Sequence, residues 1–175
     1  MQENHLASPP WWSVFDVATL SPASKFLMLY GALMWLACGL TYVLSLNDAR
    51  ALREVGIWVK PMKFMAATAL FAWTTVWVTQ LAHSTVAYGQ AYMGICTLLV
   101  ITSLFEVVYI TYQASQGAAS HYNTNDPWHA FMFGLMAIAA VGLTASQGWL
   151  AWEIWRATGS DPLPVTEQVS SLSFW

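Results

Sequence analysis

Residues 104–123 read LFEVVYITYQASQGAASHYN and place a carboxylate, Glu106, inside an apolar run that ends in a polar loop. The polar part carries Gln113, His121 and Asn123. Ionisable side chains are costly within a membrane span, so those that occur there mark ion pairs, binding sites or proton-transfer sites. This stretch therefore joins a predicted membrane span to a cluster of polar side chains.

The chain as a whole is apolar enough to be embedded in a membrane. Of its 175 residues, 57% are hydrophobic and 9% are charged, whereas soluble domains carry about 25% charged residues. The four longest apolar runs have about 20 residues each, enough to span a hydrocarbon core of about 30 Å. With six Lys and Arg residues in total, the chain has little to hold a phosphate backbone, so we exclude nucleic acid as a partner.

The sequence predicts an all-α integral membrane protein, a four-helix transmembrane bundle. Ser21-Pro22 and Asp126-Pro127 each combine an N-cap side chain with a proline suited to the first helical position, so helices are predicted to begin there. The predicted division is an interfacial or irregular N-terminal segment 1–24, a transmembrane domain 25–156 with spans at about 25–46, 61–81, 91–112 and 128–156, and a C-terminal tail 157–175.

The stretch between the first two spans, NDARALREVGIWV at residues 47–59, is rich in charge. Ala49, Leu52 and Val55 recur three residues apart, with two arginines on the other side. This pattern predicts a short amphipathic helix on the membrane surface.

Basic residues also indicate which side of the membrane this stretch occupies. Four of the six basic residues lie between positions 47 and 63, and basic loops remain in the cytoplasm. Loops 47–60 and 113–127 are therefore predicted to be cytoplasmic, and both termini to lie outside.

The polar residues of the two cytoplasmic loops are predicted to converge, because neighbouring spans run antiparallel. Lys63 and Glu106 could form an ion pair within the membrane, either as a structural lock between the second and third spans or as part of a site. The predicted ligand-binding or ion-pair cluster consists of Lys60, Lys63, Glu106, Gln113, His121 and Asn123.

A metal site is a further hypothesis. Glu106, His121 and His129 have acceptable ligand chemistry, but the sequence lacks the HxxxH or ExxH spacing of ligands on one helix, so the signal is weak. The predicted spans hold no internal histidine, and a haem held by two histidines of this chain is not expected. The sequence does not name a cofactor.

Two motifs, KPMKF at residues 60–64 and E-x6-QASQGAASHYN at residues 106–123, resemble those of a group of bacterial multi-pass membrane proteins of uncharacterised activity. That group has a WxKPxKF-like start of one span and a QAxxGxxSH[FY]N-like loop, and the similarity covers roughly residues 56–135. The resemblance implies a bacterial inner-membrane protein with both motifs at one end of the bundle, but no activity. A basic residue often precedes the loop glycine in the group. Here the residue is Gln116, which weakens any prediction that the loop itself grips a phosphate or carboxylate.

Three functions remain open from the sequence. The first is a small binding or accessory protein whose polar cluster holds a lipid headgroup, a small polar ligand or a partner subunit. The second is a membrane enzyme, with or without a metal, acting on a lipid or hydrophobic substrate with Glu106 as acid or base and His121 or His129 as its partner. The third is a proton-coupled transporter or oligomeric channel in which Glu106 titrates.

The first function is preferred, because four spans with short loops give little room for alternating access. Its expected partners are membrane lipid, further copies of the chain, or a larger membrane complex.

Overall fold

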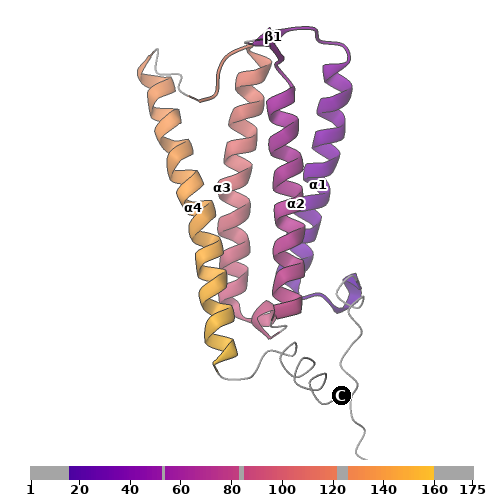
Figure 1. Cartoon of the computed structure of the whole chain (residues 1–175), viewed down its shortest axis with the longest axis vertical. Coiled ribbons are helices and arrows are strands. Elements are labelled where there is room, and N and C mark those ends of the chain that lie inside the picture. The colour runs from indigo at the N-terminus through magenta and orange to yellow at the C-terminus, as the bar shows by residue number, and fades with distance from the viewer. Residues whose placement is uncertain (1–15, 53, 83–84, 122–125, 160–175) are drawn as a thin grey trace, which may run out of the picture.

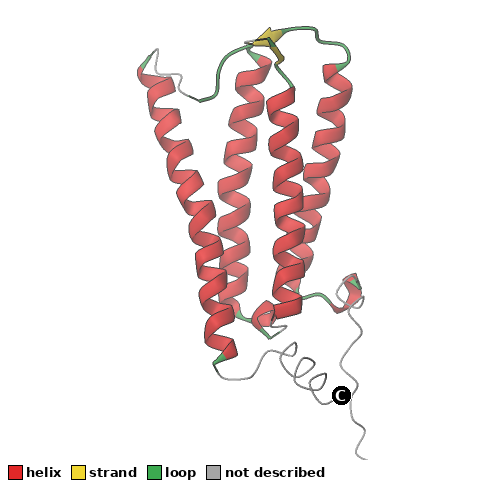
Figure 2. Cartoon of the chain, viewed as in Figure 1, coloured by secondary structure: helices red, strands yellow, loops and turns green. Residues whose placement is uncertain are grey.

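Four long helices run alternately up and down, side by side (Figure 1). The structure is a computed structural model that describes residues 16–52, 54–82, 85–121 and 126–159. The long helices are α1 (Pro22–Ser45), α2 (Val59–Ala82), α3 (Gln90–Ser115) and α4 (Pro127–Thr158). The short elements are the 3-10 helices η2 (Val17–Thr19) and η3 (Val86–Tyr88) and the strands β1 (Ala51–Leu52) and β2 (Val55–Gly56) (Figure 2). The predicted all-α four-helix bundle is confirmed.

All four long helices are long and apolar enough to cross a membrane. Apolar side chains also cover the outside of the bundle: Leu29 and Leu36 of α1 and Ile138 and Val141 of α4 are all exposed. An apolar surface of this extent is a liability in water but suits a hydrocarbon environment. The chain is therefore a membrane-embedded bundle.

Side-chain caps begin α1 and α4 at the predicted places. Ser21 Oγ accepts a hydrogen bond from the backbone N–H of Ser24 at 3.2 Å, and Asp126 Oδ1 accepts one from the backbone N–H of His129 at 3.0 Å. A proline stands in the first turn of each helix. Each cap pairs an N–H that the helix leaves unsatisfied, so both predicted helix starts are confirmed.

Residues 47–59 do not form the predicted amphipathic helix. Instead β1 and β2 form an antiparallel hairpin in which Leu52 lies opposite Val55. In the turn between them Glu54 has a φ of 66°, a left-handed conformation that an α-helix cannot include. A segment of this length is only marginally stable as a helix on its own. The three-residue spacing of Leu52 and Val55 arises because a two-residue turn separates these two paired positions.

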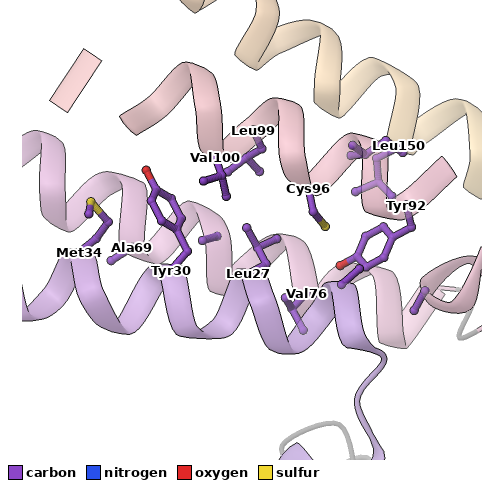
Figure 3. Close-up of a cluster of buried hydrophobic side chains, with 14 of the residues drawn as sticks. Leu27, Tyr30, Met34, Ala69, Val76, Tyr92, Cys96, Leu99, Val100 and Leu150 are labelled. Atoms are coloured by element: carbon purple, nitrogen blue, oxygen red, sulfur yellow. The ribbon is translucent and has the colours of Figure 1, made fainter. Parts of the chain in front are cut away.

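The helices pack around one core. α1 lies along α2 and α3 lies along α4, while α1 and α2 also contact α3. The buried cluster in Figure 3 includes Leu27, Tyr30, Ala69, Val76, Tyr92, Cys96, Leu99 and Leu150. A buried hydrogen bond of 2.8 Å between Tyr30 OH and Ser103 Oγ adds a polar link between α1 and α3. These contacts hold α1, α2 and α3 together.

Gly31 lets α1 and α2 approach closely. A Cβ at this position would collide with the indole of Trp73 and lie 3.2 Å from the carbonyl oxygen of Ala69. Trp73 Nε1 in turn donates to the backbone carbonyl of Met28 at 3.0 Å. The indole therefore fills the space that a larger residue would need, and it ties the two helices together.

We expect Gly31→Ala to lower the free energy of unfolding by about 1–3 kcal/mol, because the added methyl group displaces Trp73. Gly39→Ala on the same helix is the matched control, since a Cβ there meets nothing within 4 Å. Reversible unfolding in mild detergent measures both variants. Equal stability of the two would contradict the close approach of α1 and α2.

Candidate functional site

A glycine reverses the chain after α3. Gly117 has a φ of 66°, and its N–H donates to the carbonyl of Ala114 at 2.9 Å, while the N–H of Ala118 donates to the carbonyl of Gln113 at 2.9 Å. These two bonds form a Schellman motif, which pairs the last carbonyls of a helix and favours glycine at this position. The next residues, 118–121, therefore return towards α2.

Lys60, the second residue of α2, meets this returning segment. Its Nζ lies 2.6 Å from Ser120 Oγ and 2.8 Å from His121 Nδ1, and these two acceptors lie 3.2 Å apart. Ser120 is 4% exposed, and Lys60 and His121 are half-buried. We call Lys60, Ser120 and His121 the polar triad.

The ring of His121 also connects the segment to two helices. Its centroid lies 6.3 Å from that of Phe64 in α2 and 6.5 Å from that of Phe133 in α4. Both separations fall in the range of aromatic ring contacts, about 4.5–7 Å. The imidazole thus contacts the phenyl rings of Phe64 and Phe133, and its Nδ1 contacts Lys60.

The ammonium group of Lys60 has neutral partners. The ion pairs among the described residues are Arg50–Asp48, His129–Asp126 and Arg156–Glu153, and Lys60 takes part in none of them. A cation in the first turn also opposes the dipole of α2, whose positive end lies there. Within the described chain, the positive charge of Lys60 is therefore not balanced by a carboxylate.

A pocket of about 610 Å³ lies beside the polar triad. Its apolar walls include Leu52 and Val55 of the hairpin, Pro61 and Phe64 of α2, and Ile110 and Ala114 of α3. The returning segment closes another side, and Lys60, Ser120 and His121 supply the polar side chains of the lining. An apolar pocket with a few polar groups at one place suits a ligand with a hydrocarbon part and a polar end.

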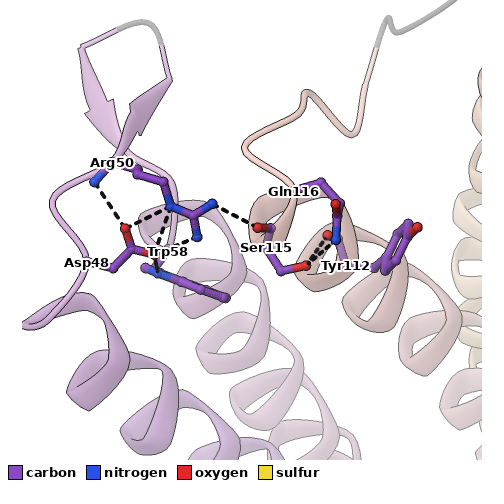
Figure 4. Close-up of polar contacts among 6 residues, drawn as sticks. All are labelled: Asp48, Arg50, Trp58, Tyr112, Ser115 and Gln116. Carbon is purple, nitrogen blue, oxygen red and sulfur yellow. Dashed lines mark hydrogen bonds and ion pairs between the residues drawn. The ribbon is translucent and has the colours of Figure 1, made fainter.

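Polar contacts fasten the hairpin wall to α3 (Figure 4). Asp48 Oδ2 lies 2.7 Å from Arg50 Nη2 and accepts from Trp58 Nε1 at 2.9 Å. Arg50 Nη1 donates to the carbonyl of Ser115, at the C-terminus of α3, at 3.0 Å. The hydrogen bonds from Arg50 hold the pKa of Asp48 well below its usual range, and the hydrogen bond from Trp58 is the second-largest cause. Asp48 therefore stays ionised near neutral pH, and the wall stays fastened.

Two of the predicted cluster residues, Lys60 and His121, come together in this site. Gln113 is buried and donates to Tyr109 OH at 2.8 Å within α3, so it stabilises the end of that helix. Asn123 lies outside the described residues.

The predicted ion pair between Lys63 and Glu106 is absent from the part of the chain that the structure describes. Lys63 is exposed on α2, whereas Glu106 is half-buried on α3. The side chain of Lys63 thus extends away from the core near the end of its helix, as expected when a long stem carries its charge to the membrane surface.

The predicted metal site is likewise not formed. Among the described residues, no three His, Cys, Asp or Glu side chains gather into a group that could hold a metal ion. His129 Nδ1 instead lies 2.6 Å from Asp126 Oδ2 at the start of α4, and His121 faces Lys60.

Ser120 is the site residue that the sequence analysis did not select. The sequence feature that could have identified Ser120 is its position beside His121 in the SH[FY]N part of the loop motif. The hairpin wall was missed as well, because residues 47–59 were predicted to be helical.

Comparisons of the chain with protein family models, curated proteins and solved structures gave no match. The class of protein, a membrane-embedded four-helix bundle with an apolar pocket and a lysine at one end, therefore follows from its own residues.

Burial lowers the pKa of His121 from its usual 6.5, and the positive charge of Lys60 is the second-largest cause of this shift. The fold thus favours the neutral imidazole, and this contribution to stability is present above about pH 6.5 and is lost as the pH falls from there to the lower, folded-state pKa. In Lys60→Met we expect the pKa of His121 to rise towards its usual value without reaching it, because burial remains. NMR titration of the histidine ring measures this, and an unchanged pKa would contradict the contact.

Proposed function

We propose that this chain is a membrane-embedded binding protein for an anionic, lipid-like amphiphile. The headgroup, a carboxylate or phosphate, binds Lys60, and the hydrocarbon chain lies in the pocket. The observation that carries the proposal is the half-buried ammonium group of Lys60, held by neutral partners at the edge of an apolar pocket.

Charge balance favours an anionic headgroup. Taking an ammonium group partly out of water without a counter-charge costs free energy. Ser120 and His121 satisfy hydrogen bonds of Lys60 but bring no negative charge. A carboxylate or phosphate brings that charge and forms charge-assisted hydrogen bonds, which are stronger than neutral ones. The cation comes from α2 and not from the loop, so Gln116 in place of a basic residue does not oppose this proposal.

The size and lining of the pocket favour a single hydrocarbon chain. Pockets for small ligands have volumes of about 300–1,000 Å³ and mostly apolar walls, and the volume here is about 610 Å³. Side chains such as Phe64 and Ile110 offer the ligand apolar surface but no hydrogen bonds. Burial of a hydrocarbon chain there contributes about 0.8 kcal/mol per CH₂ group.

The depth of the site agrees with a headgroup at Lys60. Exposed aromatic rings lie near both ends of the bundle: Tyr112 near the end of α3 and Trp128 at the start of α4 are on the side of the polar triad, and Trp152 and Trp155 are near the end of α4, on the other side. Tyr and Trp concentrate at membrane–water interfaces, and Lys60 lies in the first turn of its helix. This position near the end of the bundle supports a headgroup at Lys60, because residues beside such aromatic rings are expected at the level of lipid headgroups.

We assign this end to the cytoplasmic side of a bacterial inner membrane, with both termini outside. The support is the four basic residues between positions 47 and 63, because basic loops remain in the cytoplasm, together with the resemblance of the two motifs to bacterial membrane proteins.

Lys60→Gln is expected to weaken binding of oleate and of oleyl phosphate by roughly tenfold or more, because it removes the positive charge that Lys60 brings to the pocket, a loss of about 1.4 kcal/mol or more. Native mass spectrometry of the detergent-solubilised protein, titrated with each probe, measures the affinity. Oleyl alcohol, which has a hydrocarbon chain of the same length without charge and without an ester bond, should bind more weakly to the wild type than either anion.

Lys63→Gln is the matched control, since Lys63 is an exposed lysine on the same helix outside the pocket lining. It should leave the affinities within about twofold of the wild type, as surface charges contribute little. Equal losses in the two variants would mean that the anions follow general surface charge, and the proposal would then be wrong. Preference for oleate or oleyl phosphate decides between a carboxylate and a phosphate headgroup.

A further inference from the structure

The polar triad has the arrangement of an activated nucleophile. Activated serines lie about 2.6–3.2 Å from a base that a third group orients. Here Ser120 Oγ lies 2.6 Å from Lys60 Nζ, and Lys60 Nζ lies 2.8 Å from His121 Nδ1. Serine–lysine pairs are a recognised variant of the serine–histidine–aspartate arrangement. Nucleophile, base and orienting group are thus all present within one triad.

The surroundings of Ser120 differ from those of hydroxyl groups in the helices. Ser103 and Thr111 donate to the backbone carbonyl four residues earlier, at 2.7 Å each, which is a structural role. Ser120 instead lies in the loop, is 4% exposed and lines the apolar pocket. Its hydroxyl group therefore meets an amine at the place where the polar end of a bound amphiphile would lie.

We propose that Ser120 is a nucleophile and Lys60 its general base, and that the chain cleaves a carboxylic ester with one long hydrocarbon chain. This inference rests on the proposed function, because the same pocket holds the chain of the ester. The product is a carboxylate with a hydrocarbon chain, which belongs to the class of ligand proposed for Lys60. One site then accounts for the reaction and for retention of its product.

The reaction balances with water as the only co-reactant. Ser120 Oγ forms a bond to the ester carbonyl carbon while its proton passes to the neutral amine of Lys60. The bond from that carbon to the alcohol oxygen breaks, and Lys60 returns the proton to the leaving alcohol. Water then attacks the acyl-serine, gives a proton through Lys60 to Ser120 Oγ, and releases the carboxylic acid.

His121 acts as a positioning residue in this scheme. A neutral lysine amine still has two N–H groups, so it can donate one to His121 Nδ1 while its lone pair faces the hydroxyl hydrogen of Ser120. Since the base is a lysine amine, which acts only in its neutral form, acylation should become faster as the pH rises from about 7 to 9.

The test uses a hexadecyl fluorophosphonate, which attaches to an activated serine with loss of fluoride. The full chain in mild detergent should be labelled at Ser120, as peptide mass spectrometry would locate. Lys60→Met should be labelled about 100-fold more slowly, which is the lower end of the usual contribution of a general base. His121→Gln, which keeps a hydrogen-bond acceptor, should label faster than His121→Leu.

Ser115→Ala is the control, because Ser115 Oγ donates to the carbonyl of Tyr112 at 2.7 Å and lies outside the pocket lining. It should be labelled as fast as the wild type, while Ser120→Ala should not be labelled at all. Absence of label at Ser120 in a wild type that binds oleate would overturn the nucleophile and leave the binding proposal standing. Absence of both label and oleate binding would overturn both.

Discussion

Hydrocarbon supplies no hydrogen-bond partners, and a chain that crosses it must therefore pair its backbone groups within each helix. This constraint decides the architecture, since the four apolar helices use their own backbone bonds and the described parts of their connections lie at the ends of the bundle. It also decides where polar chemistry can gather. Lys60 belongs to a first turn and Ser120 and His121 to a connection, so they meet at the end where α2 begins and α3 ends.

The contact at Lys60 depends on two local features of the chain. Gly117, at a φ of 66°, turns residues 118–121 back towards α2, and the Asp48–Arg50 contacts fasten the hairpin to the last turn of α3. Between these supports lies a pocket whose walls are apolar and whose charge is a lysine without a carboxylate partner among the described residues. An amphiphile with an anionic end and a hydrocarbon end would bind favourably in such a site. If Lys60 loses its proton, the same contact presents Ser120 with a base.

The sequence was sufficient for the bundle, because length, hydropathy and the Ser-Pro and Asp-Pro caps are local signals of helices. It was sufficient for two members of the polar triad, because Lys60 and His121 are ionisable residues at the same end of the bundle, one in a first helical turn and the other in a connection. It failed at residues 47–59, because apolar residues three positions apart fit both an amphipathic helix and a hairpin with a two-residue turn. The left-handed backbone of Glu54 distinguishes the hairpin from the helix, and the sequence pattern does not show it. It also failed for Lys63 and Glu106. Two residues at the same depth can face different directions, and depth alone does not determine rotation about the helix axis.

The central claim is that an amphiphile occupies the pocket with its polar end at Lys60. The measurement that tests it most directly is an experimental structure of the full chain in lipid nanodiscs, at a resolution that shows individual side chains. The account predicts elongated density that begins within hydrogen-bond distance of Lys60 Nζ and continues along Pro61, Phe64 and Ile110. A pocket filled by the chain's own side chains, with Lys60 directed into solvent and away from Ser120 and His121, would contradict it.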